Sequence, residues 1–224
     1  MDNEQEVAIK LGIVGNQGAG KTSLILRVAE KKFCGNQNCG VAVDFRSIRD
    51  YKLNGKRVNL NIFDIAGLAR NSDLALSFIK DASALVLAFS LPEQEYYENQ
   101  EGQLSEQLEV QIQNWTDKIY DNSSENTPVF IVGCKLDLVK DQKRLIPALD
   151  ENLQEILKKC KKVNIINNSD KNMIFFPTSA LSGNGVDKLF QKWSSEASKI
   201  KKSHGSTLKT KSHLKKENQK EQCC

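Results

Sequence analysis

The residues best suited to chemistry form a glycine-rich loop near the start of the chain. Residues 15–22, GNQGAGKT, match the pattern G-x-x-x-x-G-K-[ST] at every defined position. Backbone N–H groups of such a loop converge on an anion at the positive end of the helix that follows. Because the loop lies between an apolar run and a helical pattern, a nucleotide-phosphate site is favoured over a simple glycine-rich turn. Its members are Gly15, Asn16, Gln17, Gly18, Ala19, Gly20, Lys21 and Thr22, with Ser23 behind them.

Lys21 and Thr22 carry the chemistry that this loop makes possible. The Lys21 amine would bridge the terminal phosphates of a nucleotide, and the Thr22 hydroxyl would ligate Mg²⁺. Further polar residues follow apolar runs at residues 64–67, 134–137 and 178–180. Ligands of open α/β sheets bind beyond the carboxyl ends of the strands, so these segments are expected beside the phosphate loop.

The apolar pattern predicts the scaffold for these residues. Strands separated by helices indicate an α/β fold with a mostly parallel six-stranded sheet and helices on both faces. A hairpin turn at Asn54-Gly55 adds one antiparallel edge strand. Strands are expected at 7–14, 41–53, 57–64, 84–90, 128–133 and 173–176, and helices after Thr22, within 65–81, and at 104–119, 149–160 and 186–200.

Composition limits the possible classes of protein. The 224 residues suit one domain with some chain left over, and 39% hydrophobic residues are enough for a buried core. No apolar run approaches the roughly 18 residues of a membrane span, and the acidic start is no signal peptide. The six cysteines form no C-x-x-C pair, so we expect a reducing cytosol and neither a disulfide framework nor a zinc site.

The positive charge is concentrated at the end of the chain. Residues 199–224 hold eight lysines and two glutamates, a net charge of +6, whereas the whole chain carries +4. Residues 1–198 are therefore close to neutral, which gives no reason to expect nucleic acid as a partner. Residues 201–222 are almost free of apolar side chains, and we expect them to be disordered.

Four motifs in this order, each at the end of a predicted strand, resemble a Ras-superfamily small GTPase over residues 7–198. The resemblance implies a P-loop NTPase fold in residues 1–200, a tail in residues 201–224, and Mg²⁺ with GTP or GDP as cofactors. It also implies effectors, an exchange factor and a GTPase-activating protein as partners.

The resemblance assigns roles to individual residues. Asp64 would hold Mg²⁺ through water, and the Gly67 amide would contact the γ-phosphate. For the base, the resemblance implies that Asp137 accepts from guanine N1 and N2, Lys135 packs on the ring, the Ala180 amide reaches O6, and Phe33 flanks the base, with Cys134, Ser179 and Leu181 completing the two base-binding segments.

The subfamily signals are mixed. Val43-Asp44-Phe45 and the terminal Cys223-Cys224 resemble Rab proteins, whereas Phe89-Ser90-Leu91, residues 132–138 and Ser179-Ala180-Leu181 look like Rho proteins. The long 138–172 segment also suits a Rho-type insertion, and residues 92–106 form a separate insertion. We favour Rab, because Rho proteins usually end in a C-a-a-X box.

Several departures from the family pattern concern hydrolysis and switching. Gly40 stands at the position of the switch I threonine, and Leu68 at that of the water-positioning glutamine. Gln17 could crowd an incoming arginine finger, and Cys134 replaces an asparagine or threonine with a weaker hydrogen-bond partner. We therefore expect slow GTP hydrolysis. A non-cycling nucleotide-bound scaffold remains an alternative, whereas a P-loop ATPase or kinase is disfavoured by Lys135-x-Asp137.

The paired terminal cysteines indicate membrane attachment. Cys223 and Cys224 resemble the Rab site for two geranylgeranyl groups, and two lipid chains anchor stably where one does not. The tail lysines would add attraction to an anionic leaflet. We expect a membrane-traffic protein on the cytoplasmic face of endomembranes, which becomes cytosolic when a carrier holds the lipids.

Overall fold

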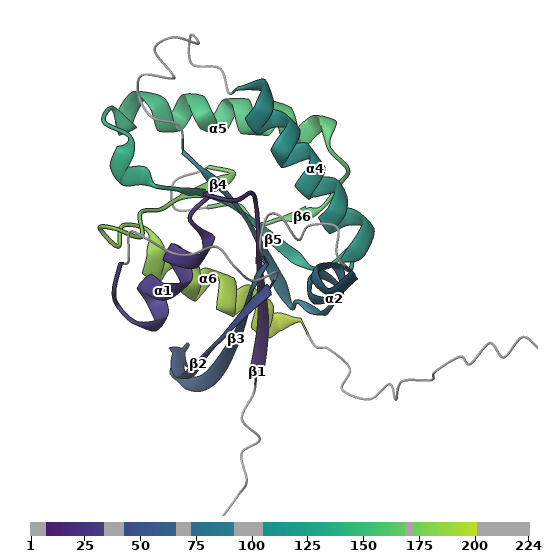
Figure 1. Cartoon of the computed structure of the whole chain (residues 1–224), viewed down its shortest axis with the longest axis vertical. Coiled ribbons are helices and arrows are strands. Elements are labelled where there is room, and N and C mark those ends of the chain that lie inside the picture. The colour runs from purple at the N-terminus through teal and green to yellow at the C-terminus, as the bar shows by residue number, and fades with distance from the viewer. Residues whose placement is uncertain (1–7, 34–42, 66–72, 92–104, 169–172, 201–224) are drawn as a thin grey trace, which may run out of the picture.

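The computed structural model describes residues 8–33, 43–65, 73–91, 105–168 and 173–200. Strands and helices alternate along most of this chain, as the sequence predicts (Figure 1). The elements are β1 (Ala8–Val14), α1 (Lys21–Ala29), β2 (Val43–Leu53), β3 (Lys56–Ile65), α2 (Asp73–Asp81), β4 (Ala84–Ser90), α4 (Glu106–Asn122), β5 (Pro128–Cys134), the 3₁₀ helix η2 (Leu136–Leu138), α5 (Gln142–Lys159), β6 (Asn164–Ile165), β7 (Phe175–Pro177) and α6 (Val186–Lys199).

The sheet is mostly parallel, which confirms the predicted α/β class. Its order is β2-β3-β1-β4-β5-β6, and β2 pairs antiparallel with β3 through the predicted Asn54-Gly55 turn. Both turn residues have positive φ, at 49° and 79°, as a tight hairpin of this kind requires.

The predicted number of six strands is wrong by one. The described sheet has seven strands, because β6 and β7 both pair with β5, on the edge that β4 leaves open. The sixth lateral position is thus shared by two short strands, one after the other. β6 has only two residues, too few for the alternation that identifies a strand in sequence.

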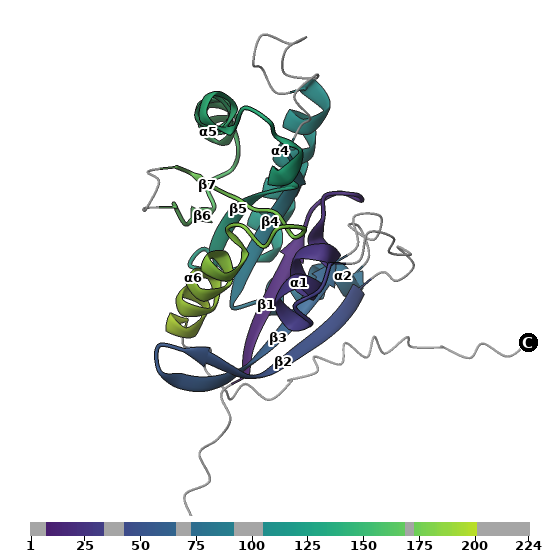
Figure 2. The same ribbon diagram turned by 90° about the vertical axis from the view of Figure 1, so that its left-hand side faces the viewer.

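Two layers of helices cover the sheet (Figures 1 and 2). Alternate strand residues face opposite layers, since Leu85 and Leu87 pack in the cluster with α2, α4 and α5. Val86 and Ala88 pack in the second cluster, with α1 and α6. β4 is therefore buried on both faces, which is why its sequence is continuously apolar.

The helix that the sequence predicts at 149–160 begins earlier than expected. α5 starts at Gln142, where the Asp141 side chain accepts a hydrogen bond from the Arg144 N–H at 3.3 Å and so caps the first turn. Leu145 and Ile146 extend the buried stripe. Pro147 lies inside the helix, where proline normally opposes helical structure, so local sequence argues against this start.

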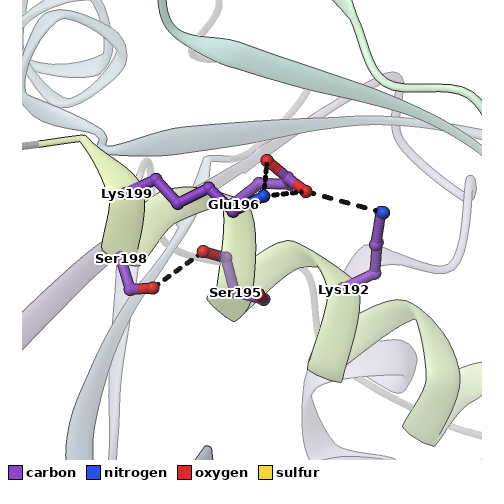
Figure 3. A network of polar contacts seen from close by, with 5 residues as sticks. All are labelled: Lys192, Ser195, Glu196, Ser198 and Lys199. Atoms are coloured by element: carbon purple, nitrogen blue, oxygen red, sulfur yellow. Dashed lines mark hydrogen bonds and ion pairs between the residues drawn. The ribbon is translucent and has the colours of Figure 1, made fainter. Parts of the chain in front are cut away.

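An ion-pair network closes the last turn of α6 (Figure 3). Lys199 Nζ donates to both carboxylate oxygens of Glu196, at 2.8 and 2.9 Å, and Lys192 lies 3.5 Å from the same group. Partial burial raises the pKa of Glu196, but the two lysines outweigh it and hold the pKa below its ordinary value. A lysine here also suits the negative end of the helix dipole.

The helices of the described ranges are too short or too polar to cross a bilayer. This finding concerns only those ranges. The predicted tail of residues 201–224 lies outside them.

We predict that Asp150 ties helix α5 to the sheet edge. Its buried carboxylate accepts hydrogen bonds from the Ile174 N–H and the Gln154 amide, both at 2.7 Å. Asp150→Ala would leave the Ile174 N–H unpaired, and we expect it to lower the free energy of unfolding by about 1–3 kcal/mol in urea denaturation. The exposed neighbour provides the control, since Glu151→Ala should change it by less than about 0.5 kcal/mol. Equal effects of the two variants would contradict the assignment.

Candidate nucleotide site

The glycine-rich loop joins β1 to α1 and is packed against the sheet. A Cβ on Gly15 would lie 2.0 Å from the Ala88 carbonyl oxygen of β4, so only glycine fits there. Gly20 has a φ of 98° and is the N-cap of α1. The loop N–H groups therefore lead directly into the positive end of this helix, as the sequence motif predicts.

Lys21 is folded back under the loop. Its side chain is buried, and Nζ donates to the carbonyl oxygens of Gly15 at 2.9 Å and Asn16 at 3.0 Å. These bonds hold a positive charge beneath the loop that precedes it. Such a charge is suited to the terminal phosphates of a bound nucleotide. Gln17 and Gly18 are exposed at the outer turn of the same loop.

Thr22 and Asp64 meet beside Lys21. The Thr22 hydroxyl donates a hydrogen bond to Asp64 Oδ2, which brings the start of α1 to the end of β3. Asp64 Oδ1 is buried and has no hydrogen-bond partner in the described part of the chain. Burial raises the pKa of Asp64, although Thr22 and Lys21 act in the opposite direction.

These two oxygen donors fit a magnesium ion. Mg²⁺ prefers hydroxyl, carboxylate and water oxygens, and a cation would satisfy the buried oxygen that Asp64 leaves unpaired. Thr22 would ligate the ion, and Asp64 would hold it through water, as the family resemblance implies.

The second half of the site lies after β5 and β7. The Leu136 N–H donates to the Thr178 carbonyl at 2.9 Å and so joins the two segments. The Ser179 hydroxyl donates to the Asp137 carboxylate, and it accepts from the Ser182 N–H at 3.1 Å. Asp137 is exposed and oriented by this pair, as recognition of a nucleotide base requires.

Cys134 links the two halves. It is buried beneath the phosphate loop, where a Cβ on Gly20 would lie 3.1 Å from its Cβ. Burial raises the pKa of the Cys134 thiol to about 11, although contact with Thr178 lowers it. The thiol therefore stays neutral and contributes packing, with little hydrogen bonding.

The remaining predicted residues are only partly placed. Lys135 precedes η2 with a φ of 64°, and Phe33 is 41% exposed at the end of a described range. Ala180 and exposed Leu181 follow Ser179 in the turn before α6. Five predicted positions lie outside the described residues, namely Gly40, Gly67, Leu68, Cys223 and Cys224.

Two features escaped the sequence analysis. The indole N–H of Trp115 on α4 donates to Asn16 Oδ1 in the phosphate loop at 2.8 Å. Phe63 also packs against two aromatic rings, with Phe45 tilted at a centroid distance of 5.3 Å and Phe78 stacked at 4.4 Å. The Trp115 signal in the sequence was only its place in a helical apolar stripe, and Phe45 was noted only as part of a Rab-like segment, with no sign of its contact with Phe63 and Phe78.

Comparisons with known proteins agree with this geometry. The family model described as "Ras family" matches residues 10–199. Ras-related protein Rab-13 of Mesocricetus auratus is 29% identical over 181 residues, which cover 81% of this chain and 75% of that protein. Rab-4 of Dictyostelium discoideum is 27% identical, covering 82% and 76%, and SEC4 of Candida albicans is 28% identical, covering 83% and 75%.

We predict that Asp64→Asn weakens magnesium binding to the nucleotide-loaded protein by roughly tenfold or more, because a metal's outer-shell carboxylate is lost. Magnesium titration of nucleotide release measures this affinity. Wild-type affinity should also fall as the pH is lowered towards the raised pKa of Asp64, since protonation removes the charge. Asp44→Asn is the control, because Asp44 is a neighbouring carboxylate paired with Arg46. An equal loss in the control would show that general charge, not a site, attracts the ion.

Proposed function

Because this chain belongs to the Ras family, we propose that it is a Rab-like small GTPase acting as a membrane-anchored switch in vesicle traffic. The observation that carries the proposal is the arrangement of three groups at one end of the sheet. Lys21 lies under the phosphate loop, and the Thr22–Asp64 pair lies beside it. Asp137, which Ser179 orients, lies on the other side of Cys134 from the loop. The groups that would bind phosphate, metal and base thus lie at the same end of the sheet.

The phosphate end of the proposed site works by fixed charge and dipoles. The loop N–H groups and Lys21 would hold the β- and γ-phosphates, with Lys21 kept in place by its bonds to Gly15 and Asn16. Bound Mg²⁺ would neutralise charge on the β- and γ-oxygens. Thr22 and Asp64 would hold that ion without a large rearrangement, since they already contact each other.

The base end of the proposed site selects guanine. Asp137 has a carboxylate that can accept from the N1 and N2 donors of guanine, whereas adenine has an acceptor at N1 and a C–H at C2. Ser179 holds Asp137 before any ligand binds, so less side-chain entropy is lost on binding. Lys135 and Phe33 would cover the faces of the ring by family resemblance.

Hydrolysis is proposed to be slow. Leu68 cannot position a water by hydrogen bonding, and Gly40 offers no hydroxyl to the metal. A partner could supply the missing groups, as GTPase-activating proteins do. The same substitutions favour a second candidate, a nucleotide-bound scaffold that does not cycle, and a Rho-like signalling role is the third.

The aromatic stack supports a partner-binding role. Phe45 is 51% exposed although it is a large apolar side chain, and it continues into Phe63 and Phe78 across β2, β3 and α2. Exposed aromatic clusters commonly mark protein interfaces. We propose this surface for effectors, because its strands and helix flank the segments that carry Gly40 and Leu68.

The tail is proposed to anchor the domain. α6 ends beside the start of β1, at the end of the sheet away from the phosphate loop (Figure 2). A chain of 25 residues follows α6 and includes Cys223 and Cys224. Two prenyl groups and nearby lysines would hold this end at the cytoplasmic leaflet of an endomembrane.

We predict that the protein binds GTP and GDP and that ATP competes at least about a thousandfold less well, because Asp137 pairs with donors that adenine lacks. Competition against a fluorescent GDP analogue measures this difference. Asp137→Ala should abolish the preference, while Asp121→Asn, which alters an exposed carboxylate on α4, should retain it. Comparable competition by ATP and GTP in the wild type would overturn guanine selectivity.

Single-turnover hydrolysis separates the slow switch from the scaffold. We predict an intrinsic rate below the roughly 10⁻⁴ s⁻¹ of Ras-type enzymes, and a higher rate for Leu68→Gln, since glutamine can orient the attacking water. Leu68→Met is the control, because it changes the side chain without adding a hydrogen-bonding amide. A wild type as fast as Leu68→Gln would show that another residue positions the water. No hydrolysis by the wild type, with or without cell extract, would favour the scaffold.

Membrane attachment depends on the terminal cysteines in this proposal. We predict that the wild type pellets with cell membranes and that the double variant Cys223→Ser with Cys224→Ser becomes soluble, because both lipid sites are lost. Fractionation of cells expressing each form measures the distribution. Cys160→Ser is the control, because Cys160 lies within the folded domain. A double variant that still pellets with membranes would rule out the lipid anchor.

A further inference from the structure

A side chain from a helix that is distant in sequence forms a hydrogen bond with the phosphate loop. Trp115 lies on α4, and its Nε1–H donates to Asn16 Oδ1 at 2.8 Å across 99 positions of the chain. The Asn16 carbonyl oxygen in turn accepts from Lys21 Nζ at 3.0 Å. One loop residue thus connects a buried indole to the lysine beneath the phosphate site.

The geometry of Trp115 is fixed by packing. Its side chain is 2% exposed and lies between Ile112 and Ile119 on the buried stripe of α4. An indole has one polar hydrogen and only two side-chain torsions, so a buried tryptophan points its donor in one direction. The bond therefore restrains Asn16, whereas a loop residue bonded only to water would be free to move.

Restraint of Asn16 has a consequence for Lys21. The carbonyls of Gly15 and Asn16 both accept from Lys21, and Gly15 is already fixed by its close approach to β4. Trp115 holds the side chain of Asn16. If Asn16 moved, Lys21 would lose the bond to the Asn16 carbonyl, which helps to place its charge under the loop.

We propose that Trp115 is a positioning residue for nucleotide retention, which acts through Asn16 on the phosphate loop and Lys21. This inference rests on the guanine-nucleotide binding proposed above. The proposed role needs no contact between Trp115 and the nucleotide, since the indole acts through Asn16. Its loss should speed release of a bound nucleotide by more than its effect on folding would explain.

The chain offers a matched control. Trp193 is the other tryptophan, fully buried on α6 in the opposite core cluster. Its Nε1 has no hydrogen-bond partner among the described residues. Trp193→Phe therefore removes a buried indole without removing such a bond, whereas Trp115→Phe removes both.

The first experiment compares release rates. Wild type, Trp115→Phe and Trp193→Phe are loaded with a fluorescent GDP analogue, and its release is followed together with thermal unfolding. We expect Trp115→Phe to release the analogue roughly two- to tenfold faster, the worth of one hydrogen bond. Trp193→Phe should release it at the wild-type rate even where it lowers the unfolding temperature. Wild-type release from Trp115→Phe, or equal acceleration in both variants, would overturn the proposal.

A double-mutant cycle tests the route through Asn16. Asn16→Ala changes a loop side chain and leaves the core intact. Its nucleotide release rate can therefore be measured even if Trp115→Phe folds poorly. If the bond carries the effect, the double variant should release nucleotide no faster than the faster single variant. Additive acceleration would show that Trp115 acts by another route.

Tryptophan emission gives an independent signal. In Trp193→Phe the remaining indole is Trp115, and its emission should change when EDTA strips magnesium and nucleotide from the loop. An unchanged emission would contradict coupling between Trp115 and the loaded loop. A wild type that binds no guanine nucleotide would overturn the proposed function and this inference together, whereas normal binding with unchanged release in Trp115→Phe overturns the inference alone.

Discussion

Burial of the Lys21 ammonium group is the constraint on which the site depends. Removing such a charge from water costs several kcal/mol unless polar groups replace the lost solvent. The carbonyls of Gly15 and Asn16 do so only if the loop turns back over the start of α1. This loop conformation also places Gly15 against the backbone of β4, where no side chain fits. The positions of β1, β4 and α1 thus follow from one buried charge.

A phosphate would complete this arrangement. Carbonyl dipoles offset part of the charge on Lys21, and an anion would supply the opposite sign. The buried Asp64 oxygen has the complementary need, since it faces a position suited to a cation. A magnesium–nucleotide complex carries both charges in fixed geometry, so binding would relieve both groups at once. The fold is therefore prepared for the pair, and neither component alone fits it as well.

The sequence predicted which segments meet at one edge of the sheet better than it predicted the elements around them. Strand ends meet at one edge of a parallel sheet, so motifs spread from Gly15 to Ser179 could be placed together before any coordinates. The two-residue strand β6 could not, because pairing with β5 makes it a strand where the local pattern does not, whereas the strand predicted at 173–176 corresponds to β7. The early start of α5 could not be predicted either, because Pro147 disfavours a helix in the local sequence, whereas packing of the buried face stabilises one.

Contacts between distant side chains were beyond sequence reasoning altogether. The apolar stripe of α4 predicts that Trp115 is buried, but the direction of its indole N–H depends on how α4 crosses the sheet. The stack of Phe45, Phe63 and Phe78 likewise depends on the register between β2 and β3. The register of two strands and the angle at which a helix crosses the sheet depend on tertiary packing. Neither contact can therefore be recognised from the local sequence pattern.

The burial of Cys134 affects how the protein responds to oxidants. Cysteines react with peroxide and electrophiles when they are accessible and form a thiolate. With a pKa near 11 and almost no exposed surface, the Cys134 sulfur presents neither the charge nor the access that such reagents need. The Cys134 side chain beneath the phosphate loop thus behaves as a small apolar group. It should resist oxidation under conditions that inactivate proteins with reactive cysteines.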